Sequence, residues 1–186
     1  MNKSLYIHIP FCQKKCSYCD FYSCCYDKLL ANAYIDVICK QIKSLNSKFY
    51  TLYIDGGTPS VLEFSLLKKL LKALSKISAK VDEFTIEVNP ESVDQRKLEL
   101  FYNSGVNRLS IGAQSFSDQK LKRLGRIHNR DKIIEAIRLA KKVGFKDIGI
   151  DLIFGVSGET LPEWGKELKQ ATSLGLKHIS TYCLTY

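Results

Sequence analysis

The chain has 186 residues, of which 45% are hydrophobic and 25% charged, a balance typical of one globular domain with a substantial core. No hydrophobic stretch approaches the roughly 20 residues that a membrane-spanning helix needs, so we expect no membrane span and a protein of the reducing cytoplasm. The net charge of +9 could attract nucleic acid. Much of it, however, lies in lysines between 68 and 80 at the spacing of an ordinary amphipathic helix face, so no nucleic-acid partner is expected.

Short strand-like runs alternate with amphipathic helical runs along the chain. In chain order we expect strands at 5–9, 50–54, 84–88, 108–111, 147–153 and 178–184, and helices at 29–45, 63–77, 93–104, 132–143 and 161–173. Glycines stand where three of these helices should end, at Gly105, Gly144 and Gly175.

Six repeats of strand and helix predict an α/β fold with a parallel sheet and outer helices. Six units fall short of the eight that close a TIM barrel, so the expected architecture is a partial, TIM-like (β/α)6 barrel with an open side. No proline-, glycine- or serine-rich linker divides the chain, which favours one domain over residues 1–186. Since nothing after the sixth strand would cover that edge, we expect a C-terminal region to be missing.

Three cysteines follow the first predicted strand with the spacing Cys-x3-Cys-x2-Cys, at Cys12, Cys16 and Cys19. Three thiolates can hold a 4Fe-4S cluster and leave one iron open to a non-protein ligand. Disulfides are disfavoured by the odd total of seven cysteines and by the absence of a signal-peptide pattern. A zinc-stabilised binding module is the stronger alternative, but Cys39 offers no close partner for a second ligand pair.

Polar groups recur at the C-terminal ends of the predicted strands, where parallel α/β folds place their chemistry. Gly56 and Gly57 follow the second strand and could bring backbone groups close to a ligand, or simply form a tight turn. The later strand ends carry Glu87, Gln114, Asp151, Tyr182 and Thr185. Together with the cysteine loop, these groups predict one site at this edge of the sheet.

Three of four polar side chains at the predicted site have both a functional and a structural interpretation. Glu87 and Asp151 could accept hydrogen bonds from ribose hydroxyls or an ammonium group, or could each form a structural ion pair. Gln114 can both donate and accept. Arg126 could make a two-pronged contact with a carboxylate, or lie solvated at a helix end.

His128, within the stretch 128–130, is a further candidate metal ligand, although a lone histidine is more often structural. His8 on the first strand could orient the cysteine loop or simply pack. Cys24 and Cys25 follow that loop closely, and the sequence leaves open whether they are alternative ligands or pack locally.

Six stretches in chain order carry a family resemblance: LYIHIPFC at 5–12, GGTPS at 56–60, EVNPE at 87–91, LSIGAQS at 109–115, LGRIH at 124–128 and IDLIFG at 150–155. As a set they resemble the oxygen-independent coproporphyrinogen III oxidase-like family of radical S-adenosylmethionine (SAM) proteins. The resemblance implies a 4Fe-4S cluster on the three cysteines of the loop. It also implies SAM contacts from Tyr6, Tyr18, Gly56, Gly57, Thr58, Glu87, Gln114, Arg126, Asp151 and Thr185.

The family has two branches, and Phe21 separates them. The oxidases carry a fourth cysteine where this chain has Phe21, and the sequence Cys-Asp-Phe is similar to the heme-chaperone branch. That branch binds heme and passes it to apoproteins, and its heme-associated histidine motif is similar to 128–130, which implies heme binding by His128. We therefore expect a heme chaperone that works with an electron donor protein and heme-accepting apoproteins. The alternative is SAM-dependent oxidative decarboxylation of coproporphyrinogen III.

Overall fold

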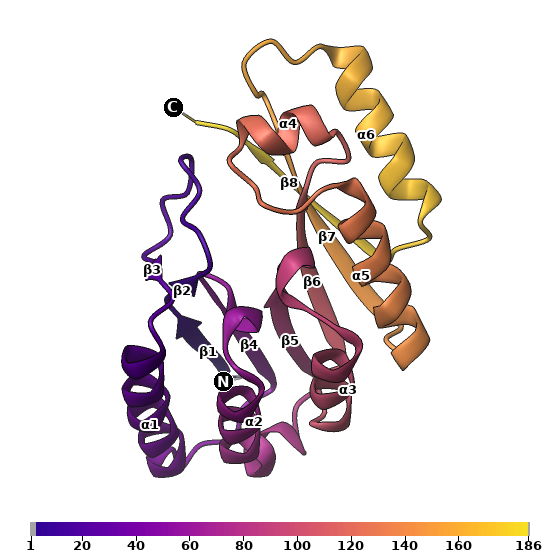
Figure 1. The fold of residues 1–186 in the computed structure, drawn as a ribbon. Helices are drawn as coiled ribbons and strands as arrows, with labels where there is room; N and C mark the ends of the chain where they lie inside the picture. Colours follow the sequence, from indigo (N-terminus) through magenta and orange to yellow (C-terminus); the bar gives the residue numbers. More distant parts are fainter. Residues whose placement is uncertain (1–2, 186) are drawn as a thin grey trace.

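A computed structural model describes residues 3–185 of the chain. Its centre is a six-stranded parallel sheet in the order β1-β4-β5-β6-β7-β8. The strands are β1 (Ser4–Ile9), β4 (Thr51–Gly56), β5 (Glu83–Val88), β6 (Arg108–Gln114), β7 (Asp147–Phe154) and β8 (His178–Cys183). Each strand lies beside the one before it in this series, so the predicted α/β fold of a partial barrel is confirmed (Figure 1).

Helices connect the strands and cover one face of the sheet (Figure 1). They are α1 (Lys28–Ser44), α2 (Phe64–Ser78), α3 (Gln95–Asn103), α5 (Arg130–Val143) and α6 (Leu161–Ser173), with single 3-10 turns η1 (Pro59–Val61) and η2 (Pro90–Ser92) after β4 and β5. Asp27, Asp94 and Asn129 each accept a hydrogen bond from the backbone N–H three residues further on, which fixes where α1, α3 and α5 begin. Thr160 begins α6 with a reciprocal capping box to Glu163.

Two short features do not appear among the predicted elements. The helix α4 (Asp118–Arg123) has six residues, too few for the apolar periodicity that reveals longer helices. The two-residue strands β2 (Phe11–Cys12) and β3 (Cys24–Cys25) pair in parallel and close the cysteine loop. Both features lie at the end of the sheet where the strands finish (Figure 1).

Side chains alternate along each strand between two faces of the sheet. One set is buried and packs under the helices; it includes Ile7, Ile9, Leu52, Ile54, Phe84, Ile86, Leu109, Ile111, Ile148 and Ile150. The alternate positions face away from the helices and are largely polar; they include Tyr6, His8, Tyr53, Asp55, Glu87, Ser110 and Asp151. The hydrophobic core therefore lies between sheet and helices, and the other face is free to build a site.

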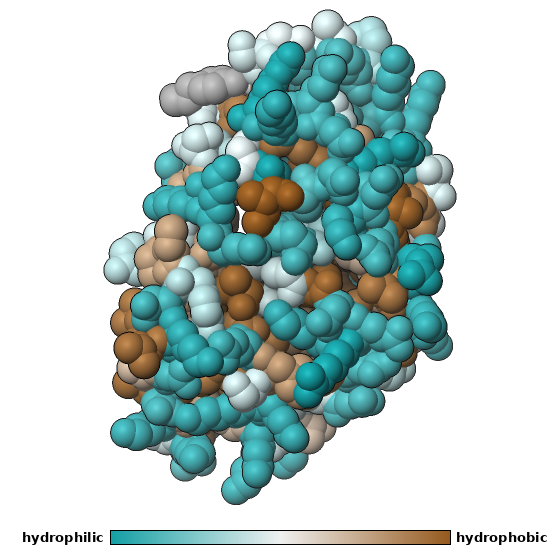
Figure 2. Space-filling model, viewed as in Figure 1, coloured by the Kyte–Doolittle hydropathy of each residue, from teal (hydrophilic) through white to brown (hydrophobic). Residues whose placement is uncertain are grey.

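The surface on the helical side is mostly hydrophilic, with hydrophobic side chains in scattered small groups (Figure 2). Within residues 3–185, no helix combines the length and the hydropathy that crossing a membrane would require.

Candidate functional site

The cysteine loop is held at the end of β1 by backbone hydrogen bonds. The N–H of Cys24 donates to the carbonyl of Pro10 at 2.7 Å, and that of Tyr26 donates to the carbonyl of Cys12 at 2.8 Å. The His8 ring contacts the carbonyl of Tyr22 at 2.8 Å through Nε2, so this histidine helps to orient the loop. Cys12 is buried, and burial raises the pKa of its thiol.

The turn after β4 lies directly against the loop. The N–H of Gly57 donates to the carbonyl of Ile9 at 2.8 Å, and that of Thr58 donates to the carbonyl of Phe11 at 2.7 Å. A Cβ atom on Gly57 would lie 2.7 Å from the Phe11 oxygen and 2.8 Å from Cys12 Sγ. Only glycine allows this approach, which explains the Gly56-Gly57 pair better than a free tight turn does.

Arg126 brings a positive charge to the cysteines. Its Nη1 lies 3.6 Å from Cys16 Sγ, while Nη2 donates to Asn89 Oδ1 at 2.5 Å and to the carbonyl of Gly112 at 3.2 Å. Its Nε is buried and has no partner among the described atoms. A fixed guanidinium beside thiolates stabilises their charged form. The structure therefore places Arg126 in the site and not at a solvated helix end.

Inward-facing carboxyl groups lie beside the cysteine region. Tyr53 donates to Glu87 Oε1 at 2.6 Å, and Ser110 donates to Asp151 Oδ2 at 3.2 Å. Burial, a hydrogen bond with Asp55 and the Asp55 charge together raise the pKa of Glu87 to about 9. Burial likewise raises the pKa of Asp151. Among the described residues neither carboxyl makes an ion pair, so the structural ion-pair interpretation is wrong for both.

One cavity of about 450 Å³ brings these groups together. Its lining includes Cys12, Cys16, Tyr18, Cys19, Gly56, Gly57, Thr58, Glu87, Gln114, Arg126, Asp151 and Thr185. Of the residues expected to bind SAM, only Tyr6 is outside this lining; it lies behind it, 3.4 Å from Asp55. Gln114 sits at a bulge in β6 with φ +64°, a strained conformation that turns its side chain out of the regular alternation.

His128 does not join this cavity. Its side chain is 0% exposed, with Nδ1 2.7 Å from Glu91 Oε2 and Nε2 3.1 Å from the carbonyl of Ala113. Because both ring nitrogens have protein partners, neither can ligate heme iron in this conformation. The geometry instead assigns His128 to positioning Glu91, which does line the cavity.

Asn89, Tyr53 and Asp55 are site residues that the sequence interpretation did not single out. Asn89 bridges two predicted residues, because its Nδ2 donates to Thr58 Oγ1 at 2.8 Å and its Oδ1 accepts from Arg126. Tyr53 and Asp55 stand at inward positions of β4, and strict alternation by two along that strand could have identified them. The exposed Cys24 and Cys25 lie outside the cavity lining.

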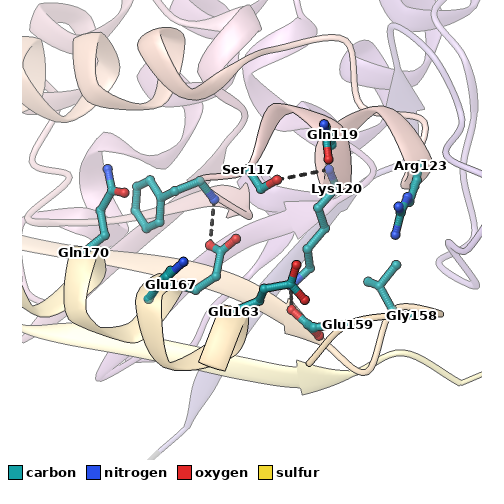
Figure 3. A pocket seen from close by; sticks show the side chains of 12 residues that line it. Ser117, Gln119, Lys120, Arg123, Gly158, Glu159, Glu163, Glu167 and Gln170 are labelled. Atoms are coloured by element: carbon teal, nitrogen blue, oxygen red, sulfur yellow. Dashed lines mark hydrogen bonds and ion pairs between the residues drawn. The ribbon is translucent and has the colours of Figure 1, made fainter. Parts of the chain in front are cut away.

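A second cavity of about 270 Å³ lies between α4 and α6 (Figure 3). Its charged groups are largely engaged with one another. Lys120 forms an ion pair with Glu159, and Glu167 accepts from the N–H of Phe116 at 2.7 Å and from Ser115 Oγ at 2.5 Å. These contacts fasten α6 to the end of β6, so this cavity has a structural role.

The donors that the first cavity offers a metal are the thiols of Cys12, Cys16 and Cys19, the ligand type that holds a 4Fe-4S cluster. Arg126 lines the same cavity, and its unpartnered Nε leaves a hydrogen-bond donor for a polar ligand there.

The chain is similar to several known proteins. The profile of the Radical SAM superfamily matches residues 6–171. Heme chaperone HemW of Bacillus subtilis is 35% identical and that of Escherichia coli 38% identical, each over 98% of this chain and 50% of the relative. The chain thus spans about half the length of these relatives. The structure of coproporphyrinogen III oxidase HemN of Escherichia coli superposes with a TM-score of 0.88 at 28% identity, covering 98% of this chain and 44% of that one.

Proposed function

The chain belongs to the radical SAM superfamily, and we propose that it holds a 4Fe-4S cluster on Cys12, Cys16 and Cys19 with SAM beside it. The observation that carries this proposal is the single cavity in which these thiols meet Gly57 and Arg126. When bound, a reduced cluster of this kind supplies the electron that cleaves SAM to a 5′-deoxyadenosyl radical.

Different residues of the cavity would bind different parts of SAM. Gly56, Gly57 and Thr58 line the cavity beside Cys12, where they would contact SAM. Asp151 presents oxygens suited to hydroxyl and ammonium groups, Glu87 suits a hydroxyl group, and Gln114 can donate and accept. Tyr6 contributes through Asp55, while Tyr18 and Thr185 line the cavity directly.

For the whole protein we propose heme handling in the cytoplasm, with heme passed to apoproteins and an electron donor protein serving the cluster. The HemW relatives support this, and so does the rim of the cavity. Phe21, 57% exposed, stands where an oxidase would carry a cysteine, and Ile127, Tyr182 and Leu184 add apolar surface. A heme macrocycle can pack on such side chains, and Lys14 and Lys15 at the same rim suit its propionates.

Oxidative decarboxylation of coproporphyrinogen III is the second candidate, favoured by the similarity to HemN over 98% of this chain. Phe21 argues against it. Both candidates use the same cluster and SAM site, so one experiment separates them. We would reconstitute the chain anaerobically, add SAM, reductant and coproporphyrinogen III, and analyse the products by mass spectrometry. Decarboxylated tetrapyrrole together with 5′-deoxyadenosine would identify an oxidase. Absence of tetrapyrrole conversion, with heme binding by the same reconstituted chain in a parallel absorption titration, would support a chaperone.

The cluster assignment has its own test. Replacing Cys12, Cys16 or Cys19 by Ala should abolish iron incorporation, measured by iron assay and by visible absorption after anaerobic reconstitution. Cys39→Ala is the matched control, because Cys39 is buried in the core outside the cavity. Equal iron loss in all four variants would contradict the assignment, and zinc in place of iron in the wild type would identify a zinc module.

A further inference from the structure

Asp55 and Glu87 stand side by side on neighbouring strands. In the parallel register of β4 and β5, Tyr53 pairs with Thr85 and Ile54 with Ile86. One residue further on, Asp55 and Glu87 are therefore neighbours, and both belong to the set that faces away from the helices. Asp55 is only 7% exposed, so two carboxyl groups meet where water has little access.

The hydrogen bonds around the pair come from hydroxyl groups. Tyr53 donates to Glu87 Oε1 at 2.6 Å, and Tyr6 donates to Asp55 Oδ2 at 3.4 Å. Asp55 Oδ1 is buried and has no hydrogen-bond partner among the described residues. His8 is opposite Asp55 in β1, but its ring nitrogens contact the Tyr6 hydroxyl and the Tyr22 carbonyl.

No cation neutralises this pair within residues 3–185. The further groups that face it are Asp151 from β7, another acid, and Tyr182 from β8. Arg108 of β6 contacts Thr85, Glu83 and Asp147; its charge acts to lower the pKa of Asp151, but it forms no ion pair with Asp55 or Glu87. None of the ion pairs among the described residues includes Asp55, Glu87 or Asp151.

Two adjacent carboxyl groups without a cation cannot both ionise at low cost, because the second charge is repelled by the first and poorly solvated. We propose that Asp55 is a positioning residue that keeps Glu87 in its protonated form, so that the cavity presents a neutral carboxylic acid at this place. The Tyr53 hydroxyl donates to Glu87 Oε1 and leaves Oε2 available to carry the proton.

Glu87 lines the cavity and Asp55 does not. The protonation state of Glu87 therefore decides which ligand groups can bind beside it. With its proton shared with Asp55, the neutral acid offers a cavity ligand only acceptor oxygens, which suit a hydroxyl or another uncharged donor. A cationic group there would have to displace the proton. The inference concerns Glu87 itself and does not depend on the cluster, on SAM or on the proposed function.

Infrared spectroscopy of the chain tests the inference directly. The carbonyl stretch of a protonated carboxylic acid lies above the amide I band and shifts in D2O, so the spectrum of the wild type minus that of Glu87→Gln isolates this group. We expect a protonated band at pH 7 that disappears with a midpoint near pH 9. In Asp55→Asn the midpoint should fall by about one pH unit or more, because the like charge is removed.

Asp36→Asn is the matched control, since Asp36 lies on the exposed surface of α1 and should leave the midpoint unchanged. Asp55→Ser provides a second variant, and far-ultraviolet circular dichroism checks that each variant stays folded over the titration. A missing band at pH 7, or an unchanged midpoint in a folded Asp55 variant, would overturn the inference. SAM binding measured in parallel keeps this result separate from the proposed function.

Discussion

Replacing Gly57 by Ala tests the close contact on which the cysteine loop depends. The added Cβ would lie 2.7 Å from the Phe11 oxygen and 2.8 Å from Cys12 Sγ, whereas ordinary contacts begin near 3.4 Å. One side must therefore move by roughly 0.7 Å. The blocking Phe11 oxygen belongs to the backbone. Hydrogen bonds from Gly57 N to Ile9 and from Thr58 N to Phe11 hold that segment, so it cannot move without weakening them.

We expect Gly57→Ala to lower the free energy of unfolding by about 1–3 kcal/mol, the usual cost of overpacking, and to reduce iron incorporation because Cys12 is displaced. Gly165→Ala is the matched control. Gly165 lies within α6 with nothing within 4 Å of its added Cβ, so alanine should stabilise by about 0.5–1 kcal/mol without affecting iron. Urea denaturation of the cluster-free chain and an iron assay measure both effects. Wild-type stability and wild-type iron content in Gly57→Ala would refute the reasoning.

Two further predictions concern buried carboxyl groups. Because the folded pKa of Glu87 is raised to about 9, its stabilising effect is complete below the unfolded value near 4.5 and is lost as pH rises towards 9. Between pH 5 and 8, the unfolding free energy of the wild type should fall, relative to that of Glu87→Gln, by up to about 1.4 kcal/mol per pH unit. Denaturation at several pH values measures this, and an equal pH dependence of the unfolding free energy in both proteins would contradict it. Glu167→Ala leaves the Phe116 N–H and the Ser115 hydroxyl without their acceptor and should cost about 3 kcal/mol. The exposed control Glu135→Ala should leave the urea midpoint unchanged, and an equal loss in both variants would count against a structural role for Glu167.

The sequence by itself determined the features that follow from local periodicity and spacing. Alternating strand and helix patterns predicted the parallel sheet, because each pattern reflects which face of an element is buried. The cysteine spacing predicted a cluster loop directly after β1, and the rule that parallel strands end at a common edge predicted that Gly57, Glu87 and Asp151 would meet.

Tertiary structure decided what depends on register and on contacts between distant segments. Only the pairing of β4 with β5 sets Asp55 beside Glu87, and only the tertiary structure shows that no ion pair within residues 3–185 includes either of them. Arg126 could be a site residue or a solvated side chain by sequence, and its place depends on Asn89 and Cys16 from other parts of the chain. The expectation that His128 binds heme rests on the similarity of residues 128–130 to a family motif. Its burial and its contacts with Glu91 and Ala113 depend on the whole fold and cannot be read from local sequence.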